Sequence, residues 1–252
     1  MLNINLKPEY ILSVKGFLVT NVFLTSVLVT VILVIMALVF YANRKNQKNF
    51  IINIFRVLIY ELLKFIDVVT EDRELSKKIL PLIATFFIFI VTANLLALIP
   101  GFLGSFFIKT TAGQLPFLRS PNSSLTTTLA LALFSVFSIQ IFSLKTLGFG
   151  GYVKKFINLS SPIKFILGFF EMLSEAVKII SFSFRLFGNI FAGEVLLLVV
   201  AFLVPYILPL PFMILEVFVG IIQAFIFAAL TLTFIQSNTM RHISSNVQTV
   251  NN

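Results

Sequence analysis

Residues 181–194 read SFSFRLFGNIFAGE and set an arginine and a glutamate inside a long apolar run. The run extends from Ser161 to Leu203, about 40 residues or about 60 Å of helix at 1.5 Å per residue. Because the hydrocarbon core of a bilayer is only about 30 Å thick, such a helix must emerge or tilt well beyond the usual angle. A second long run follows from Pro205 to Gln236. We therefore expect two strongly tilted membrane helices that form a hairpin.

The composition of the whole chain favours an integral membrane protein. Of its 252 residues, 58% are hydrophobic and only 12% are charged, whereas soluble domains carry about 25% charged residues. The net charge of +9 comes from basic residues in loops between apolar runs, not from the contiguous stripe typical of nucleic-acid binding. Cysteine is absent and His242 is the only histidine, so we expect no metal site and no cofactor.

The apolar runs predict an all-α fold that forms one membrane domain over residues 1–252. Between the first two spans, apolar residues recur at helical spacing, which indicates an amphipathic helix. This helix lies either at the membrane surface or, as a short helix outside the membrane, against the bundle. Thirteen Lys and Arg residues on one face against four on the other place the C-terminus inside. The expected elements are a span at 16–41, the amphipathic helix at 46–78, and spans at 79–101, 125–144, 161–203 and 205–236.

Charged residues within the apolar spans are concentrated in the last two. A charge in the membrane costs about 2.5–3.5 kcal/mol on insertion scales, so such residues usually have a function. Here they are Glu171, Glu175, Lys178, Arg185, Glu194 and Glu216, joined by the amide of Gln223.

The spacing of these residues sorts them into faces of the helix. Glu171, Lys178 and Arg185 are seven residues apart and share one face. Ser181 and Asn189 flank the arginine at i−4 and i+4. We expect a polar stripe along this side of the helix.

A hairpin around Pro205–Pro211 predicts which residues meet. Arg185 and Gln223 are equidistant from position 204, and Glu194 and Glu216 from position 205. Two facing carboxylates cannot easily both ionise, so this pair could relay protons or cations in an outer cavity.

The inner part of the hairpin has two interpretations. Glu171 and Glu175 could line a second pocket that opens inward. Glu175 and Lys178, three residues apart, fit an ordinary ion pair equally well. Arg185 is different, because it lies near mid-span with no acid at i±3 or i±4 and needs a partner elsewhere.

Three motifs make a family resemblance specific. The stretch from Ser181 to Glu194 resembles the S-x-x-x-R-L-F-G-N-x-x-A-G-E motif of the F-type ATP synthase a subunit. Residues 223–227, QAFIF, and residues 94–101, NLLALIPG, are similar to two further motifs of that family. Together the motifs spread from about residue 80 to residue 236.

The resemblance implies a non-catalytic stator subunit that passes protons or sodium to a ring of c subunits through two half-channels. Further implied partners are b-type peripheral stalk subunits, the rest of the complex and membrane lipid, with no nucleic acid. The implied location is the bacterial inner membrane, or alternatively an organellar inner membrane. The residues implied in ion translocation are Arg185 facing the ring, Asn189, Gln223 and Ser181 near it, Glu194 and Glu216 in the outer half-channel, and Glu171, Glu175 and Lys178 toward the inner one.

The sequence departs from the family pattern before the third span. Residues 121–126, PNSSLT, lack the acid and the asparagine that the family often carries there. This departure argues against a charged lining at the outer mouth from residues 121–126, and it does not concern the core of the site.

Two other function classes fit the sequence less well. A secondary ion-coupled transporter predicts an inverted repeat and helices broken at mid-membrane, and neither pattern is found. An intramembrane enzyme needs a metal cluster or a nucleophile with a base. The single histidine and the absence of cysteine argue against both.

Overall fold

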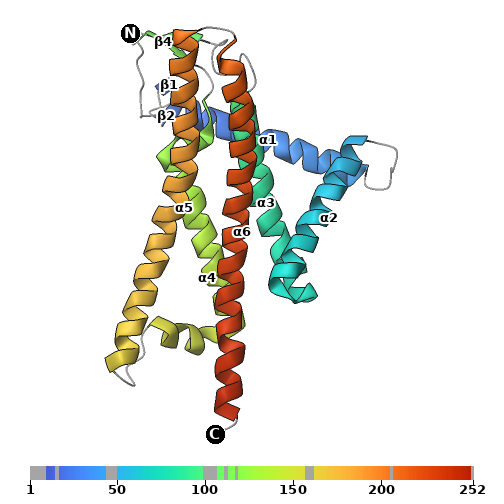
Figure 1. Ribbon diagram of the computed structural model, residues 1–252, viewed down its shortest axis with the longest axis vertical. Coiled ribbons are helices and arrows are strands. Elements are labelled where there is room, and N and C mark those ends of the chain that lie inside the picture. The colour runs from blue at the N-terminus through green and yellow to red at the C-terminus, as the bar shows by residue number, and fades with distance from the viewer. Residues whose placement is uncertain are drawn as a thin grey trace.

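A computed structural model describes residues 10–14, 17–43, 50–98, 107–110, 113–116, 119–156, 162–204 and 207–250. These residues form an all-α bundle with two small β-hairpins (Figure 1). The helices are α1 (Asn21–Ala42), α2 (Phe50–Thr70), α3 (Arg73–Leu98), the 3-10 turn η1 (Pro121–Ser123), α4 (Leu125–Phe156), α5 (Pro162–Leu203) and α6 (Pro209–Val250). The antiparallel strand pairs are β1 (Tyr10–Val14) with β2 (Phe17–Thr20), and β3 (Phe107–Thr110) with β4 (Gly113–Pro116).

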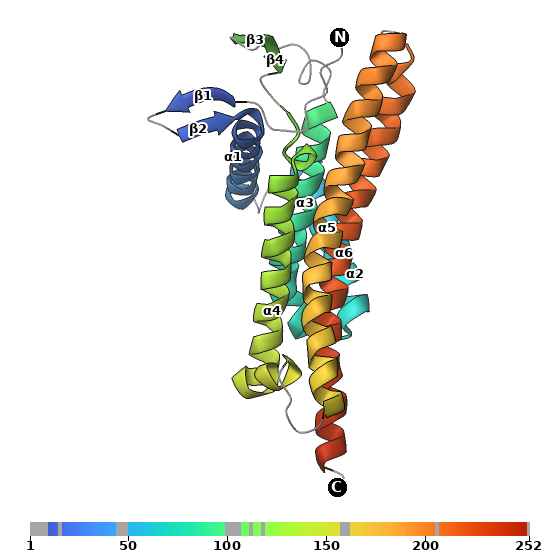
Figure 2. The ribbon, with the colours of Figure 1, turned by 90° about the vertical axis from the view of Figure 1, so that its left-hand side faces the viewer.

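Five of the described helices, α1, α3, α4, α5 and α6, are long and apolar enough to cross a membrane. This confirms the predicted fold class with its five membrane helices. The two hairpins were not predicted, because strands of four or five residues leave little periodic pattern. Both lie at the same end of the molecule as the α5–α6 turn (Figures 1 and 2).

The boundary between the amphipathic helix and the second span differs from the predicted one at residues 78 and 79. The chain breaks at Glu71, whose φ of 55° is left-handed, and α3 begins at Arg73. Hydropathy placed the start of the second span too late because the first turns of α3 carry charged residues. A salt bridge of 2.8 Å between Lys77 and Glu74 helps to keep those charges within the helix.

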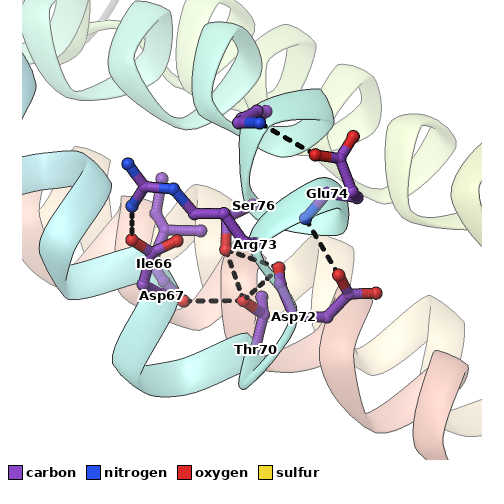
Figure 3. Close-up of polar contacts among 8 residues, drawn as sticks. Ile66, Asp67, Thr70, Asp72, Arg73, Glu74 and Ser76 are labelled. Atoms are coloured by element: carbon purple, nitrogen blue, oxygen red, sulfur yellow. Dashed lines mark hydrogen bonds and ion pairs between the residues drawn. The ribbon is translucent and has the colours of Figure 1, made fainter.

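The α2–α3 turn is a small polar cluster (Figure 3). Asp72 caps α3, since its carboxylate accepts the backbone N–H of Glu74 over 2.9 Å. The hydroxyls of Thr70 and Ser76 lie 2.7 Å apart. Gln236 of α6 donates to the carbonyl of Thr70 over 3.0 Å. The amphipathic helix α2 is thereby held against α3 and α6, on which it packs.

The last two helices, each of 42 residues, form the antiparallel hairpin that the sequence predicted (Figures 1 and 2). Helix α4 packs along α5, and α3 packs along α6. One face of α5 is buried at i, i+4 spacing, while the other face carries exposed apolar side chains. The core in which α5 meets its neighbours contains Phe86, Ile90, Ala132, Phe182, Leu186, Ile190, Ala224 and Phe227.

Two other features shape the ends of the bundle. Helix α4 kinks at Gly148, whose φ of 68° is in the left-handed region that favours glycine. Its last turns then run across the bundle (Figure 2). Helix α1 also lies across the direction of α3 to α6 (Figure 1).

Candidate functional site

The polar residues of α5 and α6 occupy three levels along the hairpin. At the middle level, the guanidinium of Arg185 donates to the hydroxyl of Ser181 over 2.9 Å. This is the i−4 neighbour that the sequence placed beside it. Arg185 is half-buried and makes no ion pair with any residue that the structure describes.

The partner of Gln223 differs from the predicted one. The sequence set Gln223 beside Arg185, but its buried amide oxygen accepts the side-chain N–H of Asn189 over 2.7 Å. The midpoint of positions 189 and 223 is residue 206. Residue 206 is also the midpoint between Leu203, where α5 ends, and Pro209, where α6 begins. The prediction centred the hairpin on 204. The contact therefore falls one turn nearer the connecting turn than expected.

Two carboxyl groups lie at the level near the α5–α6 turn. Glu194 and Glu216 are both buried, with 7% and 8% of their surface exposed. Glu216 rests against the backbone of Gly193, where a Cβ atom would lie only 2.6 Å from its carboxyl carbon. Glu194 Oε1 and Glu216 Oε2 have no hydrogen-bond partner among the described residues. Two neighbouring buried carboxyls, each with an oxygen free, are suited to holding a proton or a cation between them.

Sequence reasoning missed a cation at this level. The guanidinium of Arg119 donates to Glu194 over 3.3 Å, and both side chains are almost buried. Residues 120–124, which follow the arginine, are buried as well. Residues 121–126 themselves carry no charge, and the cation comes from Arg119, two residues before them. A possible signal was Glu194 itself, which has no basic residue at i±3 or i±4.

A chain of amides fixes the same loop to the bundle. Asn122 donates to the side chain of Asn94 on α3 over 2.7 Å. Asn94 in turn donates to the carbonyl of Gly220 on α6 over 3.0 Å. The backbone N–H of Arg119 reaches the hydroxyl of Thr25 on α1 over 3.3 Å. Three helices thus position the loop beside the carboxyl pair.

The level away from the turn contains a different polar group. Lys178 pairs with Glu175 over 2.8 Å and lies 4.6 Å from the ring of Phe234. The two side chains thus form the ion pair that their spacing allows. Tyr152, beyond the kink of α4, donates to Gln140 over 3.1 Å. Burial raises the pKa of Tyr152, and the charge of Glu175 adds to that effect. Neither Tyr152 nor Gln140 was predicted from the sequence.

Glu171 lies half-buried on α5, one turn before Glu175. Among the described residues, no three His, Cys, Asp or Glu side chains gather in a way that could hold a metal ion.

Comparison with known proteins identifies close relatives. The sequence profile of the ATP synthase A chain family matches residues 23–236. ATP synthase subunit a of Moorella thermoacetica is 36% identical over 167 residues, 66% of this chain and 67% of the relative. The subunit a of Campylobacter jejuni (strain 81-176) is 35% identical over 168 residues, 66% of either chain. That of Desulfotalea psychrophila is 38% identical over 166 residues, 64% of this chain and 61% of the relative.

Proposed function

The chain belongs to the ATP synthase A chain family, and from this premise we propose that it is the stationary ion-conducting subunit of the membrane sector. In this proposal it provides two half-channels that pass protons, or sodium, to and from a ring of c subunits. Its other partners are b-type stalk subunits and the rest of the ATP synthase. The proposed location is the bacterial inner membrane, where the chain is a multi-pass protein.

The observation that carries the proposal is the order of polar groups along the α5–α6 hairpin. A single arginine, Arg185, lies at mid-hairpin between a carboxyl pair near the turn and the Glu175–Lys178 pair at the other end. An ion entering from either side would meet exchangeable groups first and a fixed positive charge in the middle. Such an order suits two offset half-channels with a barrier between them.

Arg185 would have two tasks at that barrier. A fixed guanidinium stabilises the ionised form of a passing ring carboxylate, which allows that carboxylate to release its ion. The same charge repels a cation that moves straight from one half-channel to the other, because like charges interact strongly where water is scarce. Its bond to Ser181 would hold the guanidinium in place.

The lengths of α5 and α6 support a close fit to a curved partner. Each has 42 residues, about 63 Å of helix at 1.5 Å per residue, against about 30 Å of hydrocarbon. A strong tilt around a ring would accommodate this excess length. In this arrangement Glu194 and Glu216 line the outer half-channel, while Glu171 and Glu175 line the inner one.

The test is ATP synthesis by the assembled complex in vesicles under an imposed ion gradient, with passive ion flux recorded in parallel. We expect Arg185→Ala to abolish synthesis and to permit a passive leak. Arg185→Lys should be severely impaired, because lysine lacks the planar fork and can lose its proton when buried. Lys178→Ala is the matched control on the same helix and should be milder. Substantial synthesis by assembled Arg185→Ala complexes would overturn the proposal.

A further inference from the structure

The loop that carries Arg119 is held rigidly although it has little regular structure. Ser120, Asn122 and Ser123 are at most 1% exposed. The loop is bonded to α1 through Thr25 and to α3 through Asn94. Loops usually run over the surface, since buried backbone groups need partners. A loop buried in this way can present one side chain at a fixed position.

That side chain is the guanidinium of Arg119. Its Nε lies 3.3 Å from Glu194 Oε2 and 3.2 Å from the hydroxyl of Ser123. The two charged side chains are only 12% and 8% exposed. When a buried ion pair loses one partner, the other is left as an uncompensated charge. Arg119 is thus the counter-charge that favours the ionised form of Glu194.

The two carboxyl groups of the site are not equivalent. Among the described residues, the charged groups that face Glu194 are Arg119 and Glu216. Glu216 faces Glu194 and the backbone of Gly193, and no cation of the described part pairs with it. Within the part of the chain that the structure describes, only Glu194 of the two thus has a counter-charge.

We propose that Arg119 is a positioning residue that holds Glu194 as a fixed anion, so that Glu216 is the carboxyl group that takes up and releases the proton. The inference rests on the proposed function and names the exchanging group of the outer half-channel. A proton from outside binds Glu216 and then leaves it toward the ring carboxylate, while Glu194 stays ionised throughout. Glu194 Oε1 and Glu216 Oε2 each have no hydrogen-bond partner among the described residues, so these two oxygens can accommodate one proton.

The test is the dependence of proton flux on external pH, measured at constant sodium in vesicles that contain the assembled complex. Arg119→Gln should lower flux near neutral pH about tenfold or more. It should also move the pH of half-maximal flux upward by about 1–3 units, the effect of removing an opposite charge at short range. The direction follows because Glu194 without its cation gives up its proton only at higher pH. Arg119→Lys keeps the charge and should recover most of the flux.

A double variant separates positioning from a purely structural role. Arg119→Gln combined with Glu194→Gln removes both charges, so its flux should be no lower than that of Glu194→Gln alone, and it should assemble even where Arg119→Gln does not. Arg73→Gln is the matched control, since Arg73 forms an exposed ion pair with Asp67 at the α2–α3 turn (Figure 3). Its pH profile should equal that of the unmodified complex.

Two results would overturn the inference. One is an unchanged pH profile in assembled Arg119→Gln complexes. The other is a double variant that is worse than Glu194→Gln alone, because Arg119 would then act on something besides Glu194. An Arg185→Ala control in the same vesicles separates a failure of the proposed function from a failure of the inference about Arg119. If that variant still synthesises ATP, the proposed function fails; if it does not, failure of the Arg119 variants refutes this inference alone.

Discussion

Gly193 offers a direct way to move one carboxyl group of the site. Its missing side chain leaves the space that the Glu216 carboxyl occupies against α5. A Cβ at this position would lie 2.6 Å from the Glu216 carboxyl carbon and 3.1 Å from Oε2. We therefore expect Gly193→Ala to displace that carboxyl from Glu194 without unfolding the hairpin.

The size of the displacement follows from ordinary contact distances. Two carbon atoms pack at about 3.5 Å or more, so the carboxyl carbon, 2.6 Å from the new Cβ, must move by at least about 0.9 Å, and Oε1, which is closer still, must move with it. The Glu216 side chain is flexible and can rotate, while alanine favours the helix by up to about 1 kcal/mol over glycine. Stability should thus change little. A misplacement of about 1 Å can cost about a hundredfold in rate, so we expect flux to fall between tenfold and a hundredfold.

The assay is ion flux and ATP synthesis by reconstituted complexes, with the thermal midpoint of the complex recorded beside them. Gly150→Ala is the matched control, because a Cβ at this helical glycine of α4 meets nothing within 4 Å. Glu216→Asp added to Gly193→Ala shortens the side chain by one methylene and should recover part of the lost flux. Unmodified flux in Gly193→Ala, or a loss of the same size in Gly150→Ala, would refute the reasoning.

Two further predictions concern the packing around the site. Asn94→Leu removes a buried amide that makes two hydrogen bonds and should lower the free energy of unfolding by about 1–3 kcal/mol for each group left without a partner; an unchanged denaturation midpoint in detergent would contradict this. Gln236→Leu removes the bond to the Thr70 carbonyl and should speed hydrogen exchange at the α2–α3 turn while flux is kept. Unaltered exchange there would show that this bond does not hold the turn.

The membrane spans could be predicted from the sequence because they depend on local composition. A helix in lipid satisfies its own backbone hydrogen bonds, so about 20 consecutive apolar residues are enough to indicate one. This reasoning found the five described helices that are long and apolar enough to cross a membrane. It placed some of their ends wrongly, since residues 17–20 of the predicted first span form β2. Helix α3 begins at Arg73, six residues before the predicted start. Its first turns carry charged residues, among them the ion pair of Glu74 and Lys77, and hydropathy had assigned these residues to the amphipathic segment.

The candidate site was accessible from the sequence only in part. Ser181 and Arg185 are four residues apart on one helix, so helical periodicity predicted their contact. The contact between Asn189 and Gln223 depends on where the connecting turn ends, and a shift of two positions in its centre changed the partner. The resemblance of residues 181–194 named the residues to test, but it did not give their distances.

By itself the sequence determined the family, the all-α membrane fold and the concentration of charged residues in the last two helices. These follow from hydropathy, helical periodicity and a local motif, each of which is written in consecutive residues. Only the tertiary structure decided that Arg119 lies against Glu194, 75 positions away along the chain. This ion pair forms only when the buried loop packs against α1, α3 and α5. The two charges need each other because both are buried, and a buried charge without a partner is costly.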